Sequence, residues 1–194
     1  MANKIKLIAI ALVLFFFVVS VKAANDTMLP PSTFNAGFSF KDGLCKIKIN
    51  GEYGFINKEG RILVSCKYDY ASDFQNGFAI VRKGDKYGFI LKNGLNLTRM
   101  EFEYLEQFEG NRALFKKDNK FGYLDFEGTV VIDNIYDLGM SFQGRYAVIK
   151  KGNSTGFIDR KGIIKIKPQY TFALNFTEGV APAMKDGKWG YIDT

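Results

Sequence analysis

The chain has 194 residues, of which 27 are lysine or arginine, 20 are aspartate or glutamate and none is histidine. Because histidine is absent, Ser-His-Asp and Cys-His catalysis are excluded and the commonest transition-metal ligand is missing. The formal net charge of +7 is modest for a chain of this length and does not indicate a nucleic-acid-binding protein.

Residues 1–23 have the composition of a secretory signal peptide. Lys4 and Lys6 precede an apolar run from Leu7 to Val19, and Val21-Lys22-Ala23 forms a small-residue cleavage site. The apolar run is shorter than the roughly 20 residues of a membrane-spanning helix, and a retained membrane anchor is the alternative. Cleavage removes three lysines and lowers the net charge to 7 − 3 = +4. We therefore expect a mature chain that is secreted, periplasmic or located at the cell surface, with membrane contact only through an uncleaved leader.

Residues 24–39, which include Pro30-Pro31, are interpreted as a linker or an N-terminal cap, and residues 40–194 as one repeat domain. A glycine followed by an aromatic and an aliphatic residue recurs every 34 residues, as in 88 − 54 = 34. These glycines are Gly54, Gly88, Gly122, Gly156 and Gly190. Two aromatic columns keep the same phase, one at Tyr68, Phe102, Tyr136 and Tyr170 and one at Phe74, Phe108, Phe142 and Phe176. A repeat unit usually buries its apolar face only against its neighbours, so no unit is expected to fold alone.

Pairs of turn-forming residues precede the glycines and indicate β-hairpins, because these residues tolerate positive φ. The pairs are Asn50-Gly51, Gly84-Asp85, Asp118-Asn119, Gly152-Asn153 and Asp186-Gly187. A second turn such as Asp125-x-x-Gly128 and a β-rich run such as Val130-Val131-Ile132 follow. Each unit is therefore predicted to be a three-stranded meander with a connecting loop. The second unit is the poorest copy, because Asn96-Leu97-Thr98-Arg99 stands where its third strand belongs.

These patterns predict an all-β fold of about four and a half 34-residue hairpin repeats. We expect the repeats to form a solenoid-like or superhelical array. An open propeller-like ring is the alternative geometry, although 34 residues is shorter than the roughly 40 to 45 of a usual four-stranded blade.

Counting outward from each turn predicts which residues face each other across the hairpins. On the core face Val81 lies opposite Gly88 and Phe115 opposite Gly122, and such bulky neighbours would explain the glycines. On the other face basic residues lie opposite aromatic ones: Lys48 and Tyr53, Arg82 and Tyr87, Lys116 and Phe121, with Met184 and Trp189 in the last copy and Lys150 and Thr155 in the fourth. A cation over an exposed ring stabilises by about 0.5 to 1 kcal/mol. Seven of these residues form a candidate ligand-binding face: Tyr53, Tyr87, Phe121, Trp189, Lys48, Arg82 and Lys116. The alternative is that a neighbouring loop partly covers this face and that its residues only stabilise the sheet.

The last copy, Gly187-Lys188-Trp189-Gly190-Tyr191-Ile192-Asp193, resembles the signature of the WG-repeat proteins, also called KWG repeats. The resemblance covers the chain from about Phe40 to the end. The tryptophan is replaced in the other copies by Tyr53, Tyr87, Phe121 and Thr155, which weakens any role that depends on tryptophan. The resemblance implies β-repeat proteins of interaction-type function and supplies no catalytic residue.

The remaining residues predict no catalytic, cofactor or metal site. Acids recur at turns (Asp125, Asp159, Asp193) and after the downstream aromatic residue (Asp69, Glu103, Asp137), where turn capping explains them. One acid per turn is too sparse for calcium, and no lysine and hydroxyl pair follows the glycines as in a phosphate loop. We therefore expect a non-catalytic module that binds a protein or a glycan, without a cofactor or a nucleic-acid partner. The alternatives are a cell-wall or polysaccharide hydrolase and a structural element of a larger surface assembly.

The two cysteines of this exported chain are not expected to form a disulfide. Cys45 lies opposite Ile56, whereas Cys66 is expected beyond the far end of its third strand, about 15 Å away. That separation is too great for a disulfide bond. Cys45 occupies a column filled elsewhere by alanine, which predicts a small buried side chain.

The hairpin that carries Trp189 is expected to end in an uncapped edge strand. Pro182 in its first strand removes one ladder hydrogen bond, which blunts an edge against unwanted pairing. Self-association through this C-terminal edge strand is the alternative.

Overall fold

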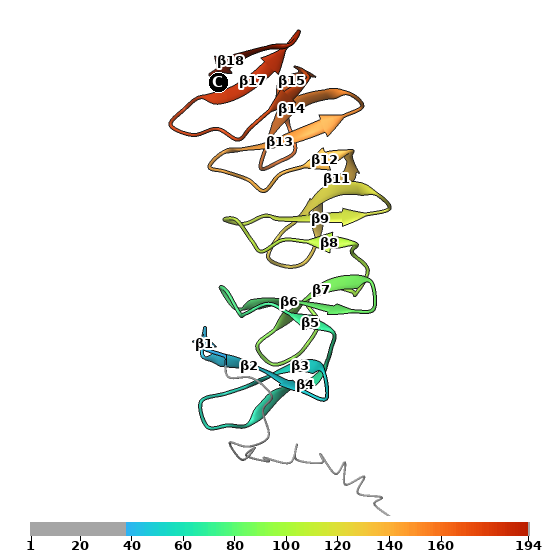
Figure 1. Cartoon of the computed structure of the whole chain (residues 1–194), viewed down its shortest axis with the longest axis vertical. Coiled ribbons are helices and arrows are strands. Elements are labelled where there is room, and N and C mark those ends of the chain that lie inside the picture. The colour runs from blue at the N-terminus through green and yellow to red at the C-terminus, as the bar shows by residue number, and fades with distance from the viewer. Residues whose placement is uncertain (1–37, 194) are drawn as a thin grey trace, which may run out of the picture.

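The computed structural model describes residues 38–193, which form a stack of five small antiparallel sheets (Figure 1). The predicted array of hairpin repeats is therefore confirmed. The predicted signal peptide, residues 1–23, lies outside the described residues, as does the predicted linker or cap up to residue 37. Within residues 38–193 no helix is long and apolar enough to cross a membrane.

Each sheet is built around one hairpin with a two-residue turn. The hairpins are β2 (Leu44–Ile49) with β3 (Glu52–Ile56), β6 (Phe78–Lys83) with β7 (Lys86–Leu91), β9 (Ala113–Lys117) with β10 (Lys120–Leu124), β13 (Tyr146–Lys151) with β14 (Ser154–Asp159), and β17 (Ala181–Lys185) with β18 (Lys188–Ile192). The first turn has the predicted conformation, because Asn50 and Gly51 both have positive φ, 51° and 85°. The predicted register is confirmed in every hairpin, including Val81 opposite Gly88.

Further strands flank the hairpins. A third strand follows in three repeats: β4 (Ile62–Tyr68), β11 (Val130–Tyr136) and β15 (Ile164–Tyr170). A two-residue strand precedes every hairpin: β1 (Phe40–Lys41), β5 (Tyr70–Ala71), β8 (Tyr104–Leu105), β12 (Leu138–Gly139) and β16 (Phe172–Ala173). The prediction of a three-stranded meander was therefore wrong by one strand, because the connecting loop contributes the short strand to the next sheet. In the second repeat isolated bridges replace the third strand. This agrees with the prediction, made from residues 96–99, that the second unit is the poorest copy.

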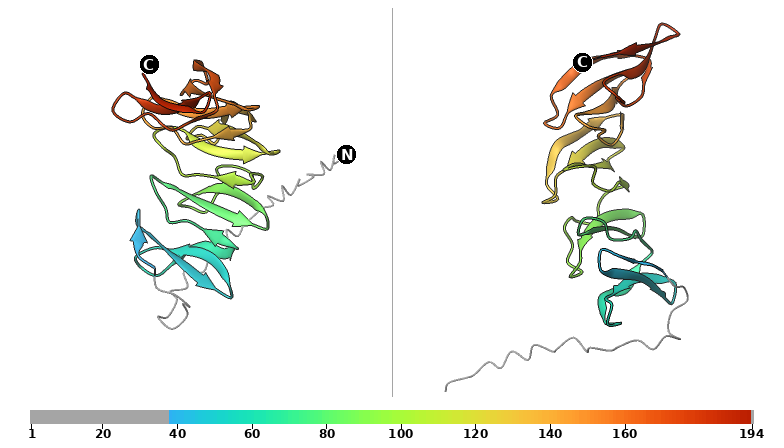
Figure 2. Two further views of the ribbon diagram at one scale, coloured as in Figure 1. Left: turned by 45° about the horizontal axis from the view of Figure 1, so that its top comes forward. Right: turned by 90° about the vertical axis from the view of Figure 1, so that its left-hand side faces the viewer.

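Successive sheets pack face to face along the long axis of the molecule (Figure 2). Phe55 of the first repeat packs against Phe74, Val81 and Ile90 of the second, and all four side chains are buried. The rings of Phe55 and Phe74 meet edge to face, with centroids 4.7 Å apart. The same arrangement recurs at the later junctions. The core is therefore divided into layers between repeats, as expected for a repeat protein.

The recurrent glycine makes room for the third strand rather than for the cross-strand neighbour. A Cβ atom on Gly54 would lie 2.5 Å from the carbonyl oxygen of Val64, and one on Gly122 would lie 2.6 Å from that of Ile132. A bulge in each third strand interrupts the pairing at this point. The sequence analysis explained the glycines by their bulky cross-strand neighbours, and this prediction was wrong because the main cause is the third strand. The bulky neighbour adds to this at Gly122, where Phe115 would come within 2.8 Å of the added atom.

Both cysteines are free. Cys45 lies opposite Ile56 and is 6% exposed, so the prediction of a small buried side chain is confirmed. The predicted place of Cys66 was wrong, because β4 continues to Tyr68 and contains Cys66.

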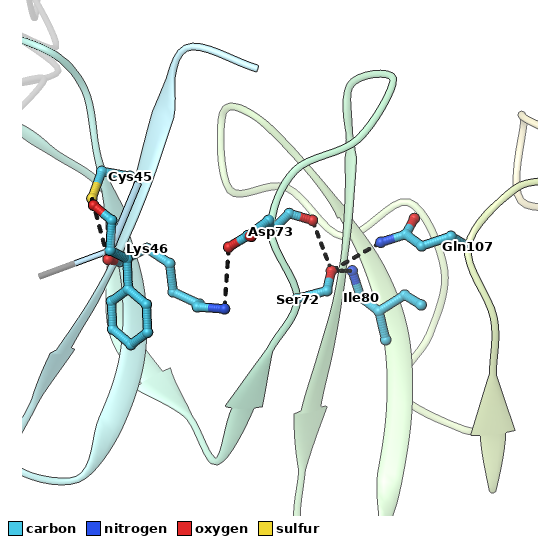
Figure 3. Close-up of polar contacts among 7 residues, drawn as sticks. Cys45, Lys46, Ser72, Asp73, Ile80 and Gln107 are labelled. Carbon is cyan, nitrogen blue, oxygen red and sulfur yellow. Dashed lines mark hydrogen bonds and ion pairs between the residues drawn. The ribbon is translucent and has the colours of Figure 1, made fainter. Parts of the chain in front are cut away.

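Polar side chains tie the first three repeats together beside the hairpins (Figure 3). Lys46 of the first repeat forms an ion pair with Asp73, at 3.1 Å between Nζ and Oδ1. The hydroxyl of Ser72 accepts hydrogen bonds from the amide of Ile80 and from Nε2 of Gln107, each at 2.9 Å. One serine therefore links the second repeat to the third, in addition to the apolar layers.

Candidate ligand-binding face

A row of side chains crosses one face of each sheet near the hairpin turn. In the third repeat the row is Tyr104, Lys116, Phe121 and Tyr136, which pair in that order across four strands. Directly paired residues lie on the same face of a sheet, so these side chains are neighbours. The equivalent rows are Lys48, Tyr53 and Tyr68; Tyr70, Arg82, Tyr87 and Phe102; Leu138, Lys150, Thr155 and Tyr170; and Phe172, Met184 and Trp189. The array therefore presents one such row per repeat.

The sequence-predicted pairs of a cation and an aromatic ring are in contact. The cation lies 4.8 Å from the ring centroid for Lys48 and Tyr53, 6.0 Å for Arg82 and Tyr87, and 5.9 Å for Lys116 and Phe121. These three rings are only partly exposed, because they pack against the core layers next to them. Among residues 38–193 no further repeat is stacked on Trp189, which is 58% exposed. The predicted residues therefore divide into half-buried stacks and one open tryptophan.

Four exposed side chains of the rows, three of them aromatic, were missed in the sequence. They are the residues that open the short strands: Tyr70 (43% exposed), Tyr104 (43%), Leu138 (37%) and Phe172 (41%). Their 34-residue column was visible in the sequence as a mostly aromatic position. Two residues are too short a segment for a strand to be recognised from periodicity, so this column was assigned to the connecting loop.

The acids that precede the short strands cap the hairpin turns, as predicted. Asp69 accepts a hydrogen bond from the amide of Gly84 at 2.6 Å, and Asp137 accepts one from the amide of Gly152 at 2.7 Å. The bond from Gly84 lowers the pKa of Asp69. The bond from the Lys120 ammonium lowers the pKa of Asp137, with that from Gly152 adding to it. Both carboxylates are thus held ionised beside the face.

The same acids offset the positive charge of the row. Glu103 lies 3.7 Å from Nζ of Lys116, and the charge of Arg82 acts on Asp69. The candidate face is therefore close to charge-balanced, with aromatic rings between paired cations and carboxylates.

A cavity of about 400 Å³ opens on this face between the third and fourth sheets. It is lined by Tyr104, Lys116, Phe121 and Glu106, and by Leu138 of the next sheet. A smaller cavity of about 100 Å³ lies one repeat further on, lined by the equivalent residues Leu138, Lys150, Thr155 and Phe172. Cavities thus lie at two successive positions of this face, and the larger one brings together two of the predicted residues, Lys116 and Phe121.

The ring of Tyr104 is held at this groove by its own hydroxyl. The hydroxyl donates a hydrogen bond to Oε1 of Glu106 at 2.5 Å. This bond to a carboxylate raises the pKa of Tyr104 to about 12, so the phenol stays protonated at neutral pH. The hydroxyl of Ser141, in the next repeat, donates a second hydrogen bond to Glu106. The groove therefore offers an apolar ring together with donors and acceptors for hydrogen bonds.

A second cavity, of about 480 Å³, is lined by Arg145, Arg160, Lys161 and Lys165. Arg160 is engaged in the fold: it donates hydrogen bonds to the carbonyl oxygens of Gly144 and Glu109 and stacks on Phe142. Lys165 pairs with Asp159 at 3.2 Å. Two of the four cations, Arg160 and Lys165, are thus committed to structural contacts. Within residues 38–193 no group of three or more acids or cysteines is placed to hold a metal ion.

Comparison with known proteins gives a family and weak structural similarities. The family model described as "WG containing repeat" matches residues 53–87, 87–121 and 156–189. No curated protein matches the chain. Dihydro-heme d1 dehydrogenase NirN in complex with DHE is 12% identical, with a TM-score of 0.38 over 77% of this chain and 42% of that chain. The hemopexin fold protein CP4 from cow pea is 15% identical, with a TM-score of 0.26 over 70% and 93% of the two chains. A plant lectin with two metal binding sites from cicer arietinum is 13% identical, with a TM-score of 0.26 over 74% and 91%.

Proposed function

The chain belongs to the WG-repeat family, and on that premise we propose that it is an exported, non-catalytic protein that binds an extended glycan. The observation that supports this proposal is the groove at Tyr104, which combines an exposed ring with Lys116 and Glu106. A smaller cavity lies one repeat further on, with Lys150 and Phe172 in its lining. A sugar ring has apolar C–H faces and hydroxyl edges, so it can stack on an aromatic side chain while cations and carboxylates bond its hydroxyls. Export rests on the signal-peptide pattern of residues 1–23.

The repeat spacing suits a polymer. Face-to-face sheets lie about 10 Å apart, so equivalent rings recur at about that interval along the array. A glycan chain presents the same chemical group at regular intervals and can contact several rows at once. Each added contact would then raise the affinity through the effective concentration of the next site.

The balance of charges favours a neutral glycan over an acidic one and over a protein. The basic residues of the face suggested an acidic glycan, but Glu103 pairs with Lys116 and Asp69 lies beside Arg82. The centres of protein interfaces are depleted in charged residues. Here the rings of the first four rows have a charged neighbour on their own row, which is the arrangement expected of a site for hydroxyl groups.

A hydrolase acting on the same polymer requires a carboxyl group with a raised pKa close to a second carboxylate. The pKa values of Asp69 and Asp137 are lowered instead, by the bond from Gly84 in the first case and by Lys120 in the second. These two acids are therefore suited to capping turns and to accepting hydrogen bonds, not to donating a proton.

The test is a glycan array probed with residues 24–194 and with the double variant Tyr70→Ala/Tyr104→Ala. The matched control is Leu63→Ala/Ile135→Ala, which removes side chains of similar exposure (43% and 50%) from third strands. Loss of two ring contacts at about 1 kcal/mol each should weaken binding about thirtyfold in the first variant and leave the control unchanged. If wild type binds no glycan, or if both variants bind as wild type does, the proposal is wrong. A host protein that wild type retains and the first variant releases would replace the glycan as the ligand class.

A further inference from the structure

Most of the positive charge of the chain lies in its fourth repeat. Residues 141–174 contain seven lysines or arginines and one acid, so their formal charge is 7 − 1 = +6, against +7 for the whole chain. The 34 residues before them carry 4 − 6 = −2, and residues 175–193 carry 2 − 3 = −1. All seven cations fall between Arg145 and Lys167, next to or within strands β13, β14 and β15. One strongly basic repeat is therefore flanked by two weakly acidic ones.

Four of the seven cations line the cavity of about 480 Å³: Arg145, Arg160, Lys161 and Lys165. One acid, Asp159, lines it as well. The carboxylate of Asp159 accepts hydrogen bonds from the backbone amides of Lys161 and Ile163, at 2.9 and 3.0 Å, and pairs with Lys165. Asp159 is therefore occupied by its own turn and by one of the four cations, and the lining keeps a charge of 4 − 1 = +3.

Two of the four cations carry an unbalanced charge. Among residues 38–193, no hydrogen bond or ion pair engages the guanidinium of Arg145 or the ammonium of Lys161. A lysine of an earlier repeat shows the contrast, since Lys92 pairs with Asp42 at 2.8 Å. The cavity thus has two cations in its lining that are available to an added anion.

Arg160 brings a guanidinium group that the fold holds in place. Its Nε donates to the carbonyl oxygen of Gly144 at 3.0 Å, its Nη1 donates to that of Glu109 at 2.9 Å, and its Cζ lies 4.9 Å from the centroid of the Phe142 ring. Its Nη2 donates no hydrogen bond to any residue of the described range 38–193. Burial, and after it the charge of Arg112, lowers the pKa of Arg160, and the opposite effect of Glu109 is smaller. Positive charge is therefore crowded at this point, and an anion there would relieve the repulsion.

Another cavity, of about 370 Å³, adjoins the first, because both are lined by Gly144, Arg145 and Tyr146. Its other lining residues include Gln143 and Glu178. The hydroxyl of Tyr146 has no hydrogen-bond partner in the part of the chain that the structure describes. The two cavities together can therefore accept an anionic group with an uncharged, hydroxyl-bearing body attached, for which Gln143 and Glu178 supply hydrogen-bonding groups.

We propose that the cavity at Arg160 binds a phosphate or sulfate group, either as the free ion or as the ester of a small hydroxyl-bearing molecule. Arg160 donates to it from Nη2, the guanidinium of Arg145 presents a fork of donors that matches two of its oxygen atoms, and Lys161 adds a point charge. Three cations converge on this cavity. A phosphate or sulfate ester offers one terminal oxygen atom to each of them, whereas a carboxylate offers only two in all.

The charge pattern favours one localised anionic group over a uniformly charged polymer such as a nucleic acid. A polyanion extended along the array would pass from the basic repeat onto segments of charge −2 and −1, where like charges repel each other. A molecule with a single phosphate or sulfate group meets only the basic repeat.

This cavity is separate from the candidate ligand-binding face. It is lined by Tyr146 and Asp159, which pair at one end of the β13–β14 hairpin, whereas Lys150 and Thr155 of the row pair four residues further along the strands. Four residues of a strand span about 13 Å. Binding of an oxyanion here therefore does not depend on the proposed glycan binding, and either can fail alone.

The test is an NMR titration of residues 24–194 at constant low ionic strength. The four probes are glucose 6-phosphate, inorganic phosphate, inorganic sulfate and glucose. The amide signals of residues 144–146 and 159–163 should shift with the three anions and should not shift with glucose.

The double variant Arg145→Gln/Lys161→Gln should weaken the binding of each anion at least tenfold. The matched control is Lys151→Gln/Lys167→Gln, which removes the same charge from the same repeat outside the lining of the cavity. The control should bind within about twofold of wild type, because salt screens charges that do not contact the anion. All four replaced side chains are exposed, so both double variants should keep their fold, and circular dichroism checks this.

Tighter binding of glucose 6-phosphate than of inorganic phosphate would assign the cavity to an ester, and equal binding would assign it to the free ion. If none of the three anions binds at about 10 mM, the proposal is overturned. Equal weakening by the two double variants would also overturn it, since binding would then follow the net charge of the repeat and not the cavity.

Discussion

Replacement of Gly122 by alanine should destabilise the protein through the backbone of the third strand. The added Cβ atom would lie 2.6 Å from the carbonyl oxygen of Ile132 and 2.8 Å from the amide nitrogen of Asn134, where ordinary contact begins at 3.4 Å. Strand β11 would therefore have to move away from β10 by several tenths of an ångström and weaken its ladder bonds. Overpacking of this kind costs about 1 to 3 kcal/mol, so we expect a loss of about 2 kcal/mol.

The control is the same substitution at Gly190. Nothing lies within 4 Å of the added atom there. Alanine restricts the unfolded chain, so this variant should be unchanged or more stable by up to about 1 kcal/mol. The two substitutions are chemically identical and differ only in the presence of a third strand.

Urea unfolding followed by circular dichroism measures both free energies, and for a chain of this size about 2 kcal/mol corresponds to a fall in Tm of about 4 to 8 °C. Equal effects at Gly122 and Gly190, or no effect at Gly122, would refute the explanation of the glycine column by the bulged third strand.

Three further predictions concern the core, the groove and the thiols. Phe108→Ala should lower the free energy of unfolding by about 3 to 5 kcal/mol, because this buried ring packs between two repeats; a loss below about 1 kcal/mol in urea unfolding would contradict that layer. The raised pKa of Tyr104, about 12, favours the protonated form in the folded state. The Tyr104 phenol therefore makes its whole contribution to the free energy of unfolding below pH 10, and this contribution is lost as the pH rises toward 12. In ultraviolet titration Tyr104→Phe should remove a late-titrating phenol, and an unchanged curve would exclude the bond to Glu106. Cys45 and Cys66 are free, so the unfolded protein should react with two equivalents of a thiol reagent without prior reduction; no reaction would indicate a disulfide.

Short-range signals in the sequence determined most of the fold. The turn pairs, such as Asn50-Gly51, set the register of each hairpin because that register follows from the turn geometry. The 34-residue columns determined the layers between repeats, since a residue such as Phe55 is buried by the next unit.

Features that depend on two distant backbones could not be predicted from the pattern. The bulge that carries the carbonyl group of Val64 over Gly54 is a property of the paired strands, so the glycine was assigned to its nearest cross-strand neighbour. The strand at Tyr104 has two residues and no periodicity. The predicted site therefore included the half-buried Phe121 and missed the exposed ring beside it.

Affinity as a function of ligand length tests the proposed binding face most directly. Oligosaccharides of increasing length, taken from the best glycan on the array, would be titrated by calorimetry into wild type and into Tyr104→Ala. Affinity for wild type should rise with length as the ligand reaches successive rows, and Tyr104→Ala should lose about tenfold for the long ligands. Affinity that is independent of length and unchanged in Tyr104→Ala would contradict an extended glycan site on this face.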